Sequence, residues 1–216
     1  MIQIKNVTFS YTVDNPVLCD ASLEINDGEP IILSGRNGAG KTTLAKLMNG
    51  LLLPGSGDVL IDGINTKEAV TLNKIRQKIA VLFSNPDNQI FSSTVDEDLA
   101  FGLENQCIEP EEMKKRIGLV IELMDIKQLR AIPVQFLSAG EKFKIVLAGI
   151  LAMKPDYIVI DNPEITEQAS GMDSIRELIE KSNNKKPSVV FMMQRLANIP
   201  KGFRVIKLEE KHFKIF

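Results

Sequence analysis

The segment GRNGAGKT, residues 35 to 42, constrains the fold of this chain more than any other feature. It follows the apolar run EPIILS and precedes TTLAKLMNGLL, in which apolar residues recur at helical spacing. A glycine-rich turn between a strand and a helix gathers backbone N–H groups and the positive end of the helix around one point, which favours phosphate. The pattern therefore predicts a nucleotide-binding loop on an α/β core.

The residues of this loop have separate expected roles. Its glycines let the backbone approach a ligand closely, because they carry no Cβ. Lys41 is expected to reach the β- and γ-phosphates of ATP, and Thr42 is expected to offer its hydroxyl to Mg²⁺. The predicted phosphate cradle comprises Gly35, Asn37, Gly38, Gly40, Lys41, Thr42 and Thr43.

A second short pattern, YIVID at residues 157 to 161, delivers Asp161 to the end of an apolar strand. Such a carboxylate, placed beside the cradle, is expected to hold Mg²⁺ directly or through a water molecule. The alternative is a carboxylate that only caps a loop. The last third of the chain then alternates strand and helix patterns, which predicts a largely parallel sheet with helices on its faces.

Composition limits the alternatives. At 216 residues and 44% apolar content, the chain can bury the core of one α/β domain, expected over residues 1–216. With 26 Lys and Arg against 28 Asp and Glu, nucleic acid is not an expected partner. The widely separated Cys19 and Cys107 fit a reducing cytoplasm. We expect no signal peptide, because the N-terminus MIQIKNVTFSY has no uninterrupted apolar region. We expect no membrane span either, because the longest apolar run, 145–153, is about half of the roughly 20 residues a span needs.

The stretch LSAGEKFKIVLAGILAMKPDYIVID, residues 137 to 161, resembles the ABC-type ATPases, whose LSGGQ signature opens a helix ahead of the strand that carries the metal-binding aspartate. Ser138 and Gly140 fit that signature, while Ala139 replaces a glycine. Taken alone, the pattern would also describe an ordinary helix capped by Ser138. The resemblance implies an N-terminal antiparallel β patch, a P-loop core and a helical insert near residues 87–140. Tyr11 falls where the family stacks an aromatic ring on adenine, although a tyrosine filling a sheet surface is the alternative.

Residues 85 to 105, NPDNQIFSSTVDEDLAFGLEN, resemble the cobalt and energy-coupling-factor (ECF) branch of ABC importers. In that branch this region faces the membrane subunit. The resemblance implies an ATP-binding subunit of an importer for a vitamin or metal ion, bound peripherally at the cytoplasmic face of the membrane. Its implied partners are a second ABC ATPase subunit and an integral membrane transport subunit. Members of this branch generally carry an additional C-terminal segment, for which 216 residues leave little room.

Four positions that the family uses for hydrolysis depart from its pattern. A glutamine, a glutamate, an aspartate and a histidine are replaced, in that order, by Ser84, Asn162, Gln168 and Gln194. The only histidine, His212, is expected to lie on a surface strand. A positioned acid–base group is worth about 10²–10⁴-fold in rate, and an amide lacks the required basicity.

Three explanations account for these departures: coordinated loss of one site, a substitute base such as Glu164 or Glu167, or a substitution introduced to trap ATP. Coordinated loss implies a heterodimer, in which Ser138 and Gly140 complete a competent site on the partner. The rivals are a nucleotide-sensing regulatory or scaffold protein and an autonomous homodimeric ATPase. DNA-acting relatives are discounted, because no sustained heptads separate the cradle from the signature.

Overall fold

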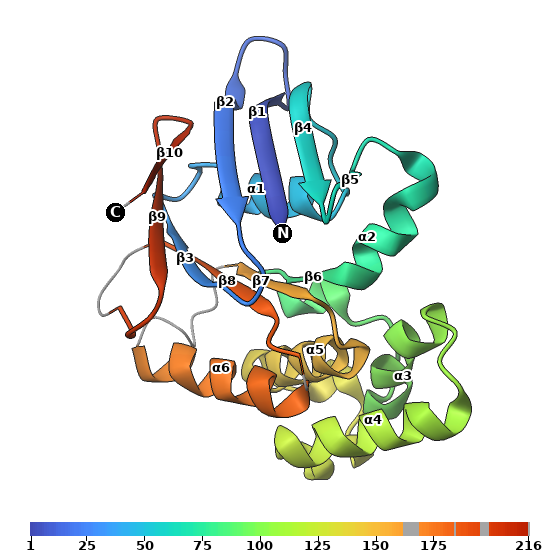
Figure 1. Ribbon diagram of the computed structural model, residues 1–216. Coiled ribbons are helices and arrows are strands. Elements are labelled where there is room, and N and C mark those ends of the chain that lie inside the picture. The colour runs from blue at the N-terminus through green and yellow to red at the C-terminus, as the bar shows by residue number, and fades with distance from the viewer. Residues whose placement is uncertain (162–168, 184, 195–198, 216) are drawn as a thin grey trace.

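The fold consists of two β-sheets with helices between them and on the outer face of the larger sheet (Figure 1). The computed structural model describes residues 1–161, 169–183, 185–194 and 199–215. Two clusters of buried apolar side chains form the core, one on each face of the larger sheet. The larger sheet therefore separates the helix after the cradle, with Leu44 in one cluster, from the signature helix, with Ile145 in the other.

The smaller sheet is antiparallel, with the strand order β2-β1-β4-β5. Side chains of β1 such as Ile2, Ile4 and Val7 are fully buried, while the intervening residues are more exposed. This alternation is typical of a sheet with one face against the core. The sheet confirms the expected N-terminal antiparallel patch. Its strands are β1 (Ile2–Ser10), β2 (Pro16–Ile25), β4 (Ser56–Ile61) and β5 (Ile64–Asn65).

The larger sheet has the strand order β10-β9-β3-β8-β7-β6 and is parallel except for the terminal β9–β10 hairpin. Every residue of β7 and β8 is buried, as expected for strands that are covered on both faces. The predicted α/β core with a mostly parallel sheet is confirmed. Its strands are β3 (Pro30–Ser34), β6 (Ile79–Leu82), β7 (Tyr157–Asp161), β8 (Ser188–Met193), β9 (Arg204–Glu209) and β10 (His212–Ile215).

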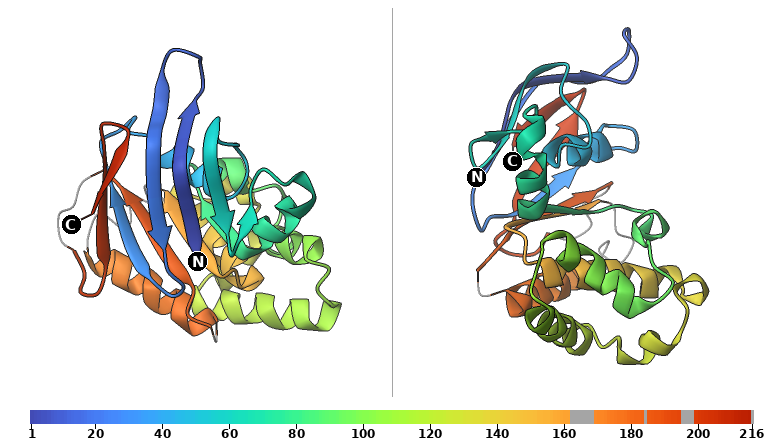
Figure 2. Two further views of the ribbon diagram at one scale, coloured as in Figure 1. Left: turned by 45° about the horizontal axis from the view of Figure 1, so that its top comes forward. Right: turned by 90° about the vertical axis from the view of Figure 1, so that its right-hand side faces the viewer.

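The helices divide between the two faces of the larger sheet (Figure 2). In α1, Leu44 and Leu47 pack in one cluster with residues of both sheets. On the opposite face, α3, α4, α5 and α6 share the other cluster. The helices are α1 (Lys41–Met48), α2 (Leu72–Lys78), α3 (Val95–Asn105), α4 (Pro110–Leu123), α5 (Ala139–Met153) and α6 (Ala169–Ser182), with short 3₁₀ turns η1 (Ala69–Thr71), η2 (Pro86–Gln89), η3 (Lys127–Ala131) and η4 (Val134–Phe136).

Two differences from the sequence interpretation have physical causes. The helix expected over residues 42–52 ends at Met48, because Gly50 adopts a left-handed conformation with φ of 69° that stops it. The strand β4 and the helix α2 had no counterpart in that interpretation, since β4 has three apolar residues at its end and α2 has only two, too few to show a period. Helices α3 and α4 lie within residues 87–140, but the boundaries of the helical insert stay a prediction.

Candidate nucleotide-binding site

The loop between β3 and α1 wraps closely against its neighbours. Gly38 and Gly40 have φ values of 78° and 103°, in the left-handed region that favours glycine. A Cβ atom on Gly40 would lie 2.8 Å from Cγ1 of Val17, and one on Gly35 would lie 2.8 Å from the carbonyl oxygen of Leu208. The loop therefore needs glycine for backbone conformation at Gly40 and for space at both Gly35 and Gly40.

The Lys41 side chain curls back over this loop. Its Nζ donates to the carbonyl oxygens of Gly35 at 2.8 Å and Arg36 at 3.1 Å. The residue is 6% exposed, and burial lowers the pKa of the ammonium group, partly opposed by the carboxylate of Asp161. Among the described residues this positive charge has only backbone carbonyls as hydrogen-bond acceptors, so it is well suited to bind phosphate oxygens.

Asp161 lies at the end of β7, where it meets the first turn of α1. Oγ1 of Thr42 donates to Oδ2 of Asp161 at 2.5 Å. The other carboxylate oxygen, Oδ1, is buried and has no hydrogen-bond partner among the described residues. Burial raises the pKa of this carboxyl group, although the Thr42 hydroxyl and the Lys41 charge oppose the shift. An unpartnered carboxylate oxygen beside a threonine hydroxyl is a donor set that fits Mg²⁺.

Tyr11 extends beyond β1 toward the start of α1. Its hydroxyl shares a hydrogen bond of 3.2 Å with the hydroxyl of Thr43, and its ring meets that of Phe9 edge-on at 5.0 Å between centroids. The residue is 59% exposed. The hydroxyl is fixed at the cradle while the ring stays open, so the stacking role and the surface role both remain predictions.

The signature residues begin α5. Ser138 forms a capping box with Glu141: its Oγ accepts from the Glu141 N–H at 3.3 Å, and Glu141 Oε2 accepts from the Ser138 N–H at 2.8 Å. Ser138 and Gly140 are exposed. Within the described part of the chain, no hydrogen bond or ion pair links Ser138 to residues 35–43. The start of α5 is therefore exposed in this chain, with Ser138 held by Glu141.

The structure places two of the four departing positions. Ser84 and Gln194 are both exposed, just beyond the ends of β6 and β8. Asn162 and Gln168 lie outside the described residues, as do the substitute-base candidates Glu164 and Glu167. His212 lies exposed on β10, as expected.

Gln89 is a residue that the sequence interpretation missed. Its side-chain oxygen accepts from the N–H of Phe83 at 2.7 Å, and its side-chain nitrogen donates to the carbonyl oxygen of Val81 at 2.7 Å. Both ends of this amide are therefore bound to β6 and the residue that follows it. Because its amide is bound in this way, Gln89 does not take the place of the glutamine that the family has at Ser84. The sequence signal that could have identified Gln89 is its position, five residues after Ser84.

A groove of about 860 Å³ begins beside Thr42 and runs between the core sheet and α3. Apolar side chains dominate it, and Phe91 and Phe101, with ring centroids 5.2 Å apart, are 70% and 45% exposed. Charged Lys46, Arg76 and Asp98 also line the groove. Such an exposed apolar surface with charged residues around it is typical of an interaction site.

The comparison with protein families decides the affiliation. Residues 18–164 match the family described as ABC transporter. This chain belongs to the ABC transporter ATP-binding family. The match includes the cradle, the signature helix and Asp161, so ATP binding follows from the family and the expected affiliation is confirmed. Among the described residues, no helix combines the length and apolar content needed to cross a membrane.

Relatives of this ABC protein include ECF ATPases. It is 40% identical to the energy-coupling factor transporter ATP-binding protein EcfA of Syntrophomonas wolfei, over 99% of this chain and 79% of the relative. It is 37% identical to EcfA1 of Caldanaerobacter subterraneus, over 97% and 78%. The similarity to the ECF branch is thus confirmed, whereas impaired hydrolysis stays a prediction.

Solved structures show the same fold. CbiO1 from Clostridium perfringens, described as part of the ABC transporter complex cbiONQ, superposes with a TM-score of 0.84 at 27% identity, over 99% of this chain and 86% of that one. A dimeric ATP-binding cassette in a post-hydrolysis state, bound to ADP and phosphate, gives a TM-score of 0.85 at 25% identity, over 100% and 98%.

Proposed function

We propose that this chain is the ATP-binding subunit of an ECF-like importer for a vitamin or metal ion, and that it binds Mg-ATP in its own cradle. The observation that carries the proposal is the Thr42–Asp161 pair beside the buried ammonium of Lys41. The cradle backbone and Lys41 would bind the phosphates, and Tyr11 would stack on adenine. The full set of nucleotide contacts proposed for the P-loop side is Tyr11, Gly35, Asn37, Gly38, Gly40, Lys41, Thr42 and Thr43.

Thr42 and Asp161 would hold Mg²⁺ at this site. The Oδ1 atom of Asp161, which has no hydrogen-bond partner in the described part of the chain, supports this assignment, since a buried carboxylate oxygen without a partner is costly unless it binds a ligand. When bound, the ion neutralises charge on the β- and γ-phosphates. The residues of this chain contribute the orientation, since the threonine hydroxyl and the carboxylate are in direct contact.

We propose further that hydrolysis at this cradle is slow. Four positions that the family uses for water activation and metal contact hold Ser84, Asn162, Gln168 and Gln194. The exposed side chain of Ser84 is too short to reach metal and water as a glutamine would. The glutamine nearest to it in the sequence, Gln89, is bound to β6 and Phe83. The exposed N-terminus of α5, with Ser138 and Gly140, would instead complete a competent site on a second ATPase subunit.

The groove beside Thr42 supports a transport role over a regulatory or scaffold role. Its proposed occupant is a short helix of the integral membrane subunit, with an apolar face for Phe91 and Phe101 and charged ends for Lys46, Arg76 and Asp98. Residues 85–105, which resemble the membrane-facing segment of the ECF branch, supply part of its wall. This contact would hold the chain at the cytoplasmic face of the membrane.

The test is an ATPase assay on this chain alone and in complex with its partner subunits. The chain alone should bind Mg-ATP and turn over poorly, whereas Ser138→Arg in this chain should abolish turnover of the complex. Unchanged turnover in the Ser138→Arg complex would refute the donation of the signature helix. Brisk hydrolysis by the chain alone that is lost in Glu164→Gln, but kept in Asn162→Ala, would instead identify a substitute base and an autonomous ATPase.

A further inference from the structure

The short segment 85–89 is fixed to the core strand β6 at one end. Gln89 binds the backbone of β6 and Phe83 through both ends of its amide. Pro86 is buried, and the Asn85 side chain accepts a hydrogen bond from the N–H of Asp87 at 3.0 Å. This turn leaves little freedom to the Asp87 backbone, so the position of the carboxylate depends on the position of the whole segment.

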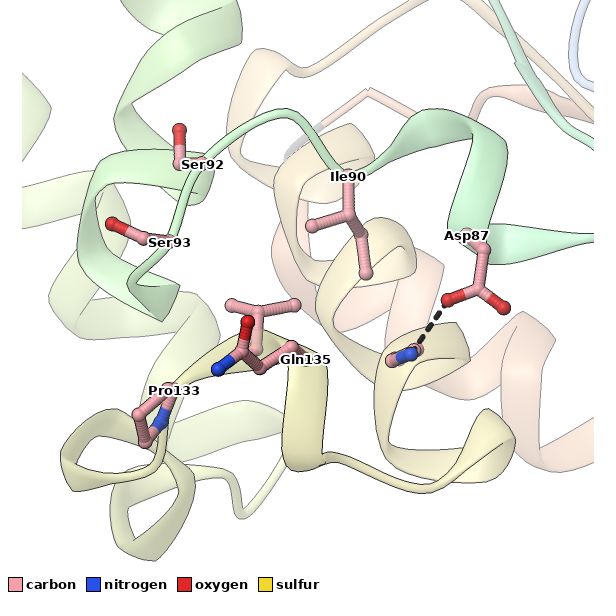
Figure 3. Close-up of a pocket in the computed structure, with 8 residues that line it drawn as sticks. Asp87, Ile90, Ser92, Ser93, Pro133 and Gln135 are labelled. Carbon is pink, nitrogen blue, oxygen red and sulfur yellow. Dashed lines mark hydrogen bonds and ion pairs between the residues drawn. The ribbon is translucent and has the colours of Figure 1, made fainter.

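Asp87 reaches across to the signature helix. Its Oδ1 accepts from Nζ of Lys142 at 2.6 Å, over 55 residues of sequence (Figure 3). Lys142 lies near the start of α5, where a cation is disfavoured by the positive end of the helix. Its side chain is only 15% exposed, and Asp87 is its only hydrogen-bond or ion-pair partner among the described residues. The start of the signature helix is therefore electrostatically tied to segment 85–89.

Side-chain packing around this ion pair is open on one side. A cavity of about 370 Å³ lies next to it, with Ile90 and Ser93 on one wall and Pro133 and Gln135 on the other (Figure 3). Beside this cavity, the ion pair is a direct polar contact between segment 85–89 and α5. A displacement of segment 85–89 would therefore shift the carboxylate that Lys142 binds, near the start of α5.

The opposite side of the same segment faces the proposed membrane-subunit groove, which Asn85, Asn88 and Gln89 help to line. We propose that Asp87 and Lys142 are positioning residues that transmit occupancy of the groove to the signature helix of this chain. The pair thereby sets hydrolysis at the site completed on the second ATPase subunit. This inference rests on the proposed function, because it needs both the groove occupant and the donated helix.

The test compares ATP turnover of the two ATPase subunits with and without the membrane subunit. The measured quantity is the ratio of the two rates, which a merely structural contact would leave unchanged. In the wild type we expect the membrane subunit to change turnover by about five-fold or more, the usual size of coupling between two sites. In Asp87→Asn or Lys142→Met we expect this ratio to fall toward one. The double variant Asp87→Lys with Lys142→Asp should restore it, because the opposite charges again face each other.

Asp96→Asn is the matched control. It breaks the ion pair of Asp96 with Arg130, at 2.6 Å, which lies in the same half of the molecule but lines neither cavity. Thermal unfolding of each variant, with the affinity for Mg-ATP, separates misfolding from a lost connection.

Two results would overturn the inference: single variants that keep the wild-type ratio, or a folded charge-swapped variant that stays uncoupled. A wild-type complex whose turnover does not respond to the membrane subunit would overturn it as well. A different result would show that the proposed function itself is wrong: Ser138→Arg would then leave turnover of the complex intact. If Ser138→Arg abolishes turnover while the Asp87 and Lys142 variants behave as wild type, only the inference fails.

Discussion

The hydroxyl of Thr42 donates a 2.5 Å hydrogen bond to the carboxylate of Asp161, although 119 residues separate them along the chain. This contact joins the first turn of α1 to the end of β7. The carboxylate is 1% exposed and one of its oxygens is unpartnered among the described residues, so its negative charge costs folding stability unless a cation binds it. Removing the charge of the Asp161 carboxylate should therefore have two opposite effects, one on folding stability and one on ligand binding.

We predict that Asp161→Asn stabilises the chain without ligands and abolishes Mg²⁺-dependent ATP binding. Since the pKa of Asp161 is raised in the folded state, that state binds a proton more tightly than the unfolded chain. The stability of the wild type thus falls as pH rises from the ordinary pKa of 3.8 through the raised value. The variant lacks this loss, and a gain of about 0.5–2 kcal/mol at neutral pH is expected.

Thermal unfolding without Mg²⁺ and nucleotide, measured across the acidic range and at neutral pH, checks the first effect. Titration with Mg-ATP checks the second. An Asp161→Asn chain that is less stable at neutral pH, or that binds Mg-ATP as the wild type does, would contradict the assigned role.

Lys41→Met should weaken Mg-ATP binding strongly and leave the fold intact. The variant keeps the aliphatic stem but removes the ammonium group, and hydrogen bonds to charged groups are worth about 1.5–3 kcal/mol each. We therefore expect at least about a ten-fold loss of affinity by isothermal titration calorimetry. The control is Lys74→Met, an exposed lysine on α2 that should bind as the wild type does. Equal affinity in the two variants would show that Lys41 does not contact phosphate.

Tyr11 can be tested by separating its ring from its hydroxyl. If the ring stacks on adenine, Tyr11→Phe should retain ATP affinity, whereas Tyr11→Ala should lose about 5–10-fold, in the range of an aromatic–base stack. Inorganic triphosphate should bind all three proteins equally, because it has no base. Val13→Ala, at a position 96% exposed in the same loop, is the control. Equal ATP affinity in Tyr11→Ala and wild type would assign the ring to the surface instead.

Phe91→Asp should impair assembly with the membrane subunit and spare ATP binding. The ring is 70% exposed, so the effect on folding stability should stay near 0.5 kcal/mol. A carboxylate within the apolar groove would oppose burial of a partner helix. Copurification and size analysis of the complex measure the effect, with Val70→Asp, at a position 95% exposed outside the groove, as control. Normal assembly of Phe91→Asp would place the membrane subunit elsewhere.

The nucleotide cradle was predictable because its determinants are local. The strand, the glycine loop and the helix follow one another within 29–52, and each glycine has its effect through its own backbone. Asp161 was predictable for a similar reason, since an apolar run delivers it to a strand end. The end of α1 was harder to predict, because Gly50 stops the helix while apolar residues such as Leu51 and Leu52 still follow the helical spacing.

What the sequence determined by itself was the α/β class, the cradle and the order of its motifs, all of which depend on short-range patterns. Only the tertiary structure decided three contacts. The Gln89 amide binds β6 and Phe83, residues as far apart in sequence as Thr42 and Met153 line one groove, and Lys142 pairs with Asp87. These contacts join elements far apart in sequence. Their geometry is set by how the helices pack on the sheet, and hydrophobic periodicity identifies a buried face without naming its partner.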